Sequence, residues 1–75
     1  MSTLYKECVV GIKCANNIIC IQTIRANAPN VCAFVDSLKI DEIIGSLAGD
    51  DTLMLIVESN ESTPKVLEIL EQYLI

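Results

Sequence analysis

Two adjacent carboxylates, Asp50 and Asp51, stand between two strongly apolar runs in the segment GSLAGDDTLMLIVE. Gly49 supplies the conformation that a tight turn needs, and Asp is a common turn residue, so turn formation is the simplest role for this pair. One Asp would suffice for a turn, however, and like charges on neighbouring residues repel each other. A carboxylate pair is a natural receptor for guanidinium, which offers five N–H donors in a rigid fork. Together with Asp36, the pair also offers oxygen ligands to Mg²⁺ or Ca²⁺, which need several converging oxygens.

Asp36 lies off the apolar stripe of a predicted helix. Cys32 and Ala33 precede it by four and three residues, so these two small side chains share its helix face. A solvated surface carboxylate is the simplest interpretation. The small neighbours also leave room beside Asp36 for a ligand group.

The charge balance and the missing residue types narrow the possible chemistry. Five basic and ten acidic residues give a net charge of −5, so the chain lacks the basic stripe that neutralises nucleic-acid phosphates. The same negative field favours a cationic ligand or a basic partner. The sequence contains no histidine and shows no nucleophile motif or phosphate-binding loop. We therefore do not expect an enzyme.

The chain contains four cysteines, at Cys8, Cys14, Cys20 and Cys32. Their spacing includes no C-x-x-C, which together with the lack of histidine argues against a zinc site. If Asn16-Asn17 forms a two-residue hairpin turn, Cys14 and Cys20 point to opposite faces of the sheet and cannot form a disulfide, whereas a loop one residue longer would allow it. We expect all four to be small buried hydrophobes in a reducing cytoplasm.

The length of 75 residues predicts one domain. A core of this size rarely supplies more than about 3–5 kcal/mol, so such domains usually need a staple, a metal or a partner. Apolar residues make up 52% of the chain, more than so small a globule can bury, which predicts an exposed apolar patch and a homo-oligomer. No segment approaches the ~20 apolar residues of a membrane span, and no signal peptide is visible. We expect a cytoplasmic protein without membrane contact.

The hydrophobic pattern predicts the order strand-strand-helix-strand-strand-helix. Strands are expected over residues 5–14, 18–24, 43–47 and 52–58. The last of these is expected to be buried on both faces, and therefore to be central or to lie at an interface. One helix is expected from an Asn27 cap to Lys39, and another opens with Thr63 as cap. This order indicates an α+β two-layer sandwich, with a four-stranded antiparallel sheet and two helices on one face. The other face is expected to need a partner; its candidate side chains are Val9, Ile19, Ile21 and part of residues 53–57.

The segment VDSLKIDEIIGSLAGDDTLMLIVES closely resembles the C-terminal, arginine-sensing and oligomerising domain of bacterial arginine repressors. The family pattern is D-x-L, a short variable loop, then G-[TS]-[IL]-x-G-D-D-T and an apolar strand. This sequence supplies the pattern at Asp36, Leu38, Gly45, Ser46, Leu47, Gly49, Asp50, Asp51 and Thr52. The element order also fits, so the resemblance covers essentially all 75 residues.

The resemblance implies a trimer whose sheets pack together, and two trimers stacked into a hexamer with L-arginine, the co-repressor, at the trimer–trimer interface. By position, Asp50 and Asp51 would hold the cationic groups of the ligand, with the guanidinium on Asp50 across the interface. Asp36, Ser46 and Ala28 would belong to the same ligand site. Arginine would act as an effector, and no cofactor is expected. Family members carry a winged helix-turn-helix domain ahead of this one, so DNA contact is expected only through that absent domain.

Three positions depart from the family pattern. The Pro-Gly pair that usually precedes the first helix reads Arg25-Ala26, and the Gln early in that helix is replaced by Pro29. Arg25 beside an acidic pocket could compete with the ligand. The alternatives are a structural oligomerisation module with a degenerate pocket and an amino-acid-sensing domain of the ACT type, which usually runs strand-helix-strand-strand-helix-strand. A small dehydratase shares the element order but relies on histidines.

Overall fold

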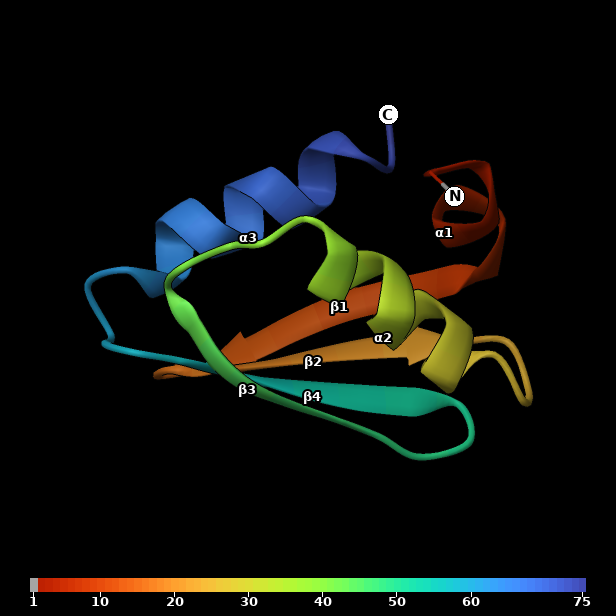
Figure 1. The fold of residues 1–75 in the computed structure, drawn as a ribbon, viewed down its shortest axis with the longest axis horizontal. Coiled ribbons are helices and arrows are strands. Elements are labelled where there is room, and N and C mark those ends of the chain that lie inside the picture. The colour runs from red at the N-terminus through yellow and green to blue at the C-terminus, as the bar shows by residue number, and fades with distance from the viewer. Residues whose placement is uncertain (1) are drawn as a thin grey trace.

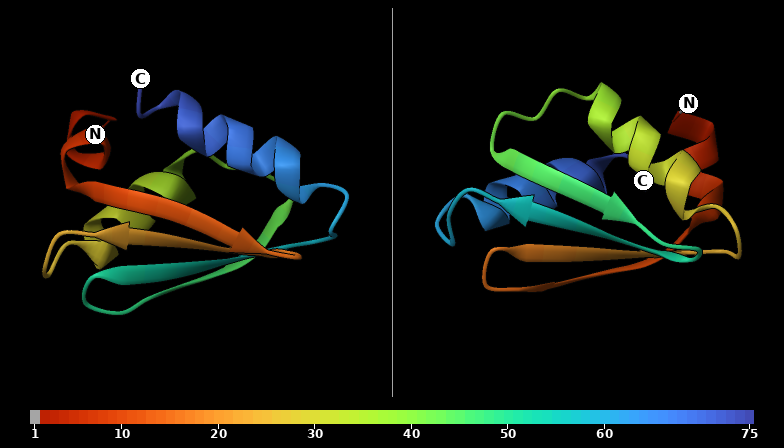
Figure 2. Two further views of the ribbon diagram at one scale, coloured as in Figure 1. Left: turned by 180° about the vertical axis from the view of Figure 1, so that it is seen from behind. Right: turned by 60° about the horizontal axis from the view of Figure 1, so that its bottom comes forward.

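The computed structural model describes residues 2–75, which form a two-layer α+β sandwich (Figure 1). The elements are α1 (Ser2–Cys8), β1 (Val9–Ala15), β2 (Ile18–Thr23), α2 (Ala28–Ser37), β3 (Ile43–Ala48), β4 (Thr52–Val57) and α3 (Thr63–Gln72). The strands form one antiparallel sheet in the order β1-β2-β4-β3, and the helices lie on one face of it (Figures 1 and 2). This confirms the predicted fold class. Within residues 2–75, no helix has the length and apolar character that crossing a membrane requires.

The N-terminal helix corrects the prediction of a strand over residues 5–14. α1 occupies Ser2–Cys8, and β1 begins only at Val9. Tyr5 and Cys8, three positions apart, are the buried residues of the helix, so the short segment has a helical apolar face. A segment of seven residues fits both the alternation of a strand and the spacing of a helix. Periodicity alone therefore assigned residues 5–8 to a strand, which is wrong.

Tyr5 joins α1 to the other two helices. Its ring is fully buried and lies 4.9 Å, centroid to centroid, from the ring of Phe34 in α2. The ring of Tyr73, just after α3, lies edge-on at 6.4 Å. The Tyr5 hydroxyl donates a hydrogen bond of 2.8 Å to the backbone carbonyl of Leu70 in α3. Burial, with a smaller contribution from the carboxylate of Glu71, raises the pKa of Tyr5 to about 12.

The hydrophobic core lies between the helices and the covered face of the sheet. Its largest fully buried side chains are Tyr5, Ile19, Ile21, Val31, Val35, Leu53, Leu55, Val57, Val66 and Leu70. Ile19 and Ile21 of β2 therefore point toward the helices, and Val9 packs against the same core. The prediction that Val9, Ile19 and Ile21 lie on the open face is therefore wrong. For β2, both faces are apolar in the sequence, so the pattern does not show which face the helices cover.

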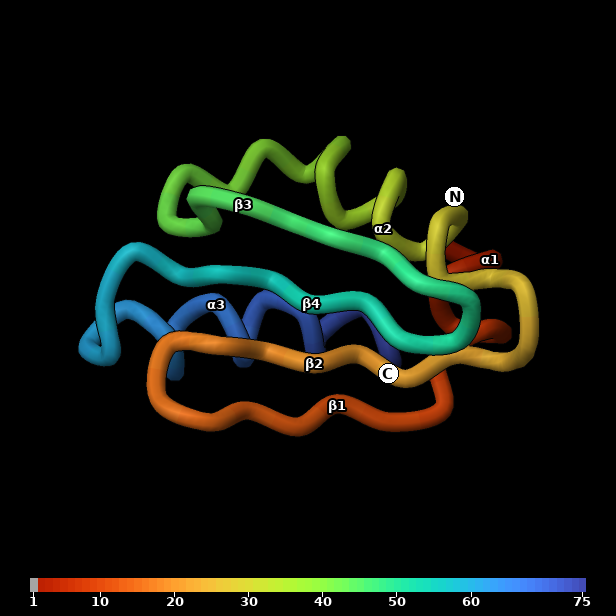
Figure 3. Tube along the Cα trace, turned by 90° about the horizontal axis from the view of Figure 1, so that it is seen from below, coloured from red at the N-terminus to blue at the C-terminus, as the bar shows by residue number. Residues whose placement is uncertain are grey.

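The open face of the sheet carries rows of apolar side chains paired across the strands. Met54 on β4 aligns with Cys20 on β2 and with Leu47 on β3, and Ile56 aligns with Ile18 in the next row. Directly opposed residues of an antiparallel pair share a face of the sheet. Leu47 is 71% exposed, Met54 39% and Ile56 37%, and Figure 3, which views this face, shows no helix over it. Within the single chain β4 is thus buried on one face only, and its place between β2 and β3 agrees with the expectation that this strand is central or lies at an interface.

The hairpin between β1 and β2 has the predicted two-residue turn. Asn16 adopts a left-handed conformation with φ of 56°, and the register places Cys14 and Cys20 on opposite faces of the sheet, as predicted. All four cysteines are free thiols. Cys8 and Cys32 are buried, but Cys14 is exposed and Cys20 only half-buried. The expectation of four buried cysteines is therefore correct for two of them.

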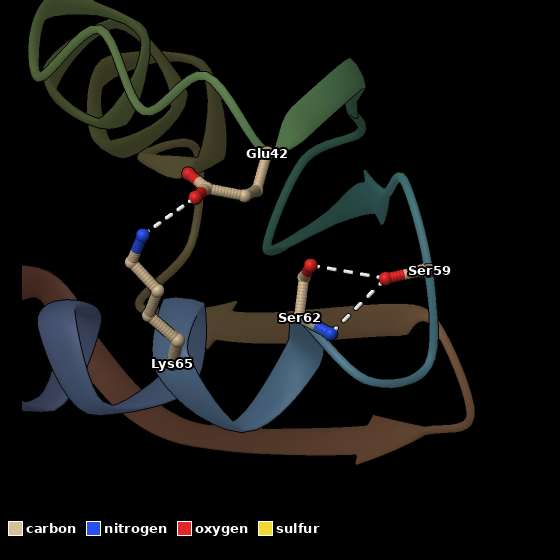
Figure 4. Close-up of polar contacts among 4 residues, drawn as sticks. All are labelled: Glu42, Ser59, Ser62 and Lys65. Atoms are coloured by element: carbon tan, nitrogen blue, oxygen red, sulfur yellow. Dashed lines mark hydrogen bonds and ion pairs between the residues drawn. The ribbon is translucent and has the colours of Figure 1, made fainter.

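Polar contacts fix the start of α3 (Figure 4). The Ser59 hydroxyl donates to Ser62 Oγ at 3.0 Å and accepts the Ser62 backbone N–H at 3.1 Å, while the Thr63 hydroxyl donates to the Ser59 carbonyl at 2.9 Å. The helix begins at Thr63, with Ser62 rather than Thr63 in the cap position. The Lys65 ammonium lies 2.6 Å from the Glu42 carboxylate, and this hydrogen bond lowers the pKa of Glu42. Both groups are solvated, so the ion pair adds little stability.

Alkaline titration is expected to destabilise the fold through Tyr5. Its pKa of about 12 in the folded protein exceeds the ordinary value of 10.0, so the stability contributed by the neutral, buried phenol is complete below pH 10 and is lost as the pH rises toward 12. Urea unfolding across this window should show a falling midpoint for the wild type and a flatter profile for Tyr5→Phe. At neutral pH the variant should lose about 1–2 kcal/mol, because the Leu70 carbonyl loses its donor. Equally steep alkaline losses in both proteins would contradict this assignment.

Candidate ligand site at the carboxylate turn

The hairpin between β3 and β4 presents Asp50 and Asp51 at one end of the sheet. The Gly49 N–H donates to the carbonyl of Thr52 at 2.9 Å and closes the turn. Both aspartates are exposed, and the hydroxyl of Thr52 donates to Asp51 Oδ1 at 3.2 Å. The two carboxylates are thus held at a hairpin tip and remain open to solvent, as the turn chemistry of the segment predicts.

The turn is docked onto the loop that leads from β2 into α2, and Figure 3 shows the two segments side by side. The Ala28 N–H donates to the Asp50 carbonyl at 3.0 Å, and the Thr23 N–H donates to the Asp51 carbonyl at 2.7 Å. The Ala26 N–H donates to the carboxylate oxygen Oδ2 of Asp50 at 3.2 Å. The backbone of the two aspartates is therefore fixed by the neighbouring loop, and one carboxylate oxygen already has a donor.

The sequence pattern did not reveal the contact of the Ala26 backbone with Asp50. Ala26 has φ of 67°, in the left-handed region where a Cβ costs roughly 1–2 kcal/mol. Asn27, the predicted side-chain cap of α2, forms no cap hydrogen bond; its Nδ2 donates instead to the Arg25 carbonyl at 2.9 Å, and its Oδ1 accepts from Asn30 Nδ2 at 3.2 Å. The family pattern has glycine at position 26, and glycine often marks a position with positive φ. That glycine was the one sequence signal that could have indicated the left-handed conformation of Ala26.

Asp36 lies on α2 opposite β3, away from the hairpin tip. The Ser46 hydroxyl donates to Asp36 Oδ1 at 3.0 Å, and the Cys32 thiol lies 4.0 Å from Asp36 Oδ2 on the predicted shared helix face. Asp36 also lines a hollow of about 320 Å³, together with Lys39 and Asp41 near the end of α2. The two aspartates of the turn are not among the residues that line this hollow.

Within one chain the predicted site residues form two groups. Asp36 and Ser46 make one group through their side chains. Asp50, Asp51 and Ala28 make the other, in which the fully buried Ala28 contributes its backbone N–H. Across residues 2–75, no side-chain hydrogen bond connects the two groups.

The electrostatic character of both groups is negative. Among the described residues, no lysine or arginine nitrogen lies within 4.0 Å of the carboxylates of Asp36, Asp50 or Asp51. The same part of the chain gathers no cluster of three acidic or cysteine side chains that could hold a metal ion. The arrangement suits a cationic organic ligand, whose donors can reach carboxylates that lie apart.

Comparison with known proteins gives consistent matches. The sequence model of the family described as "Arginine repressor, C-terminal domain" matches residues 5–72. An arginine repressor from Thermotoga petrophila is 43% identical over 70 residues, covering 93% of this chain and 46% of the relative. An arginine repressor from Syntrophomonas wolfei is 33% identical over 75 residues, covering 100% of this chain and 49% of the relative. The chain therefore spans about half the length of these curated relatives.

Replacing Ala26 with glycine is expected to stabilise the protein. The left-handed φ of Ala26 costs more with a Cβ than the extra unfolded-state entropy of glycine, which leaves a net gain of roughly 0.5–1 kcal/mol for Ala26→Gly. The matched control is Ala33→Gly, at an exposed position inside α2, which should cost about 1 kcal/mol. Urea unfolding of the two variants should shift the midpoint in opposite directions; shifts in the same direction would contradict the strain assigned to Ala26.

Proposed function

The chain belongs to the family of arginine repressor C-terminal domains, and on this premise we propose that it is the oligomerisation and L-arginine-sensing domain of a transcriptional regulator of arginine metabolism. The observation that carries the proposal is the turn of Asp50 and Asp51. Its backbone is held by the residues from the end of β2 to the start of α2. Its two carboxylates are exposed and have no cationic side chain as partner within residues 2–75.

The chemistry of the turn matches the cationic groups of L-arginine. A carboxylate accepts two parallel N–H bonds from guanidinium, and such charge-assisted pairs are stronger and more directional than neutral hydrogen bonds. In the proposal, Asp50 and Asp51 take the cationic groups of the ligand, with the guanidinium on Asp50. Asp36 and Ser46 line the same site. Because the two groups are separate within one chain, the site is proposed to lie between subunits, where a second copy completes it.

Assembly is proposed to use the open face of the sheet. The row of Leu47, Met54 and the half-buried Cys20 is the kind of apolar surface that a second copy buries. We propose a trimer built on this face and a hexamer in which two trimers meet at their carboxylate turns. Acidic groups brought together at that junction repel until a cationic ligand neutralises them, so arginine would tighten the assembly by linkage.

The rest of the functional proposal concerns the longer protein. DNA contact is assigned to a winged helix-turn-helix domain outside these 75 residues, because the chain itself carries a net charge of −5 and would repel phosphates. Arginine serves as effector, no cofactor or catalytic role is proposed, and the location is the cytoplasm. The second candidate function is a structural oligomerisation module. It is favoured by the Ala26 N–H, which already occupies one oxygen of Asp50.

Isothermal titration calorimetry with L-arginine and L-citrulline tests the sensing role. Citrulline has nearly the shape of arginine without the guanidinium charge, so it should bind far more weakly. Asp50→Asn keeps an acceptor for the Ala26 N–H but removes the charge, and should weaken arginine binding by about tenfold or more. Glu61→Gln, an exposed acid in the loop before α3, is the matched control and should bind as the wild type does. No arginine binding at millimolar concentration would contradict sensing and leave the structural module.

Light scattering after size-exclusion chromatography tests the proposed assembly. Leu47→Lys places a charge on the open face, where Leu47 is 71% exposed in the single chain. Assembly through this face would bury the unpaired charge, which is costly, so the variant should form smaller species than the wild type. Ile75→Lys adds the same charge at a residue that is 92% exposed near the helix layer (Figure 1), and should leave the assembly unchanged. A wild-type protein that is monomeric at micromolar concentration would contradict the proposal.

A further inference from the structure

The ligand proposed above carries an anion that its receptor does not yet account for. L-Arginine has an α-carboxylate besides its two cationic groups, and Asp36, Asp50 and Asp51 all repel that carboxylate. Pro29, near the start of α2, offers neither a backbone N–H nor a polar side chain. The hydroxyl of Ser46 already donates to Asp36. A cationic group from elsewhere would offset this repulsion for a free amino acid in the site.

Arg25 lies next to the carboxylate turn and is fixed there by its backbone. The adjoining Ala26 N–H binds the carboxylate of Asp50, and the Arg25 carbonyl accepts a hydrogen bond from Asn27 Nδ2. The residue is exposed. Its side chain therefore leaves the backbone one residue away from the amide that contacts Asp50.

The Arg25 guanidinium has no carboxylate partner in the described part of the chain. No ion pair joins the guanidinium to an acidic group within residues 2–75, although the backbone N–H of the next residue, Ala26, binds the Asp50 carboxylate. Two of the other basic residues are less suited to serve this turn. Lys65 is paired with Glu42. Lys39 follows the last residue of α2, whereas the turn contacts the first residue of this ten-residue helix, so the backbone of Lys39 lies at the far end from the turn.

We propose that Arg25 binds the α-carboxylate of the ligand and thereby determines specificity. A guanidinium binds a carboxylate through two parallel N–H bonds in a fixed geometry. With acids on one side and Arg25 on the other, the site becomes a receptor for zwitterionic amino acids with a cationic side chain. It discriminates against guanidinium compounds that lack the carboxylate. This inference rests on the proposed arginine-sensing function and opposes the view that Arg25 competes with the ligand.

Calorimetry with L-arginine and with agmatine, its decarboxylated form, separates these roles at physiological ionic strength. The wild-type chain should bind arginine more tightly than agmatine. Arg25→Ala should weaken arginine binding by about tenfold or more, the usual effect of losing a charge-assisted hydrogen bond, without weakening agmatine binding. Arg25→Lys keeps the charge without the bidentate geometry and should give an intermediate loss. Lys6→Ala, which removes an exposed charge on α1, is the control and should match the wild type.

The outcomes distinguish this inference from the function on which it rests. If the wild type binds arginine and Arg25→Ala binds it equally well or more tightly, Arg25 is not the carboxylate receptor, and tighter binding of both ligands identifies it as a competitor. If arginine and agmatine affinities fall together in Arg25→Ala and in Arg25→Lys, the residue supports the loop rather than the carboxylate, which also overturns the inference. If the wild type binds no arginine, the sensing function and this inference both fail.

Discussion

The candidate site depends on the docking of one short turn onto one short loop. Three backbone N–H groups between the end of β2 and the start of α2 bind oxygens of Asp50 and Asp51. Through these bonds the tip of the β3–β4 hairpin is tied to the start of the helix that carries Asp36. Buried backbone N–H groups, such as those of Thr23 and Ala28, seldom remain unpaired. Because their acceptors are the carbonyls of the two aspartates, the conformation of the loop and the position of the turn depend on each other.

The uncovered face of the sheet gives the fold its second constraint. All three helices pack on one side, so alternate residues of β4 fall into two environments: Leu53 and Leu55 are fully buried, whereas Met54 and Ile56 stay more than a third exposed. A chain of 75 residues buries a limited share of its apolar surface on folding alone. An interface on the open face would add burial without lengthening the chain, and it would bring several carboxylate turns into one assembly.

The elements from residue 18 onward follow from the amino-acid pattern, because each is an apolar or periodic segment bounded by turn or cap signals. The start of the chain does not. Residues 5–8 belong to a helix although they were predicted as the start of a strand, since the seven residues of α1 give too few positions to separate the two periods. The side of the sheet that the helices cover was also assigned wrongly for Ile19 and Ile21. Both faces of β2 are apolar in sequence, and only the packing of α1, α2 and α3 decides between them.

The sequence identified the candidate carboxylates because turn chemistry and the spacing of the family motif are local features. The contact of the Ala26 backbone with Asp50 was not predicted, since it joins residues that are 24 positions apart and involves no side chain of Ala26. The same holds for the division of the site into two groups. How Asp36 on a helix and Asp50 on a hairpin lie relative to each other follows from the tertiary packing.

A donor that belongs to the backbone has a consequence for how this site can change over evolution. Every residue except proline has the backbone N–H that binds Asp50 from position 26. A change of side chain at this position therefore does not remove the donor. Selection at that position then acts mainly on φ, and a residue that tolerates the left-handed region preserves the contact. Neighbouring side chains such as Arg25, in contrast, can vary while the carboxylate turn keeps its attachment.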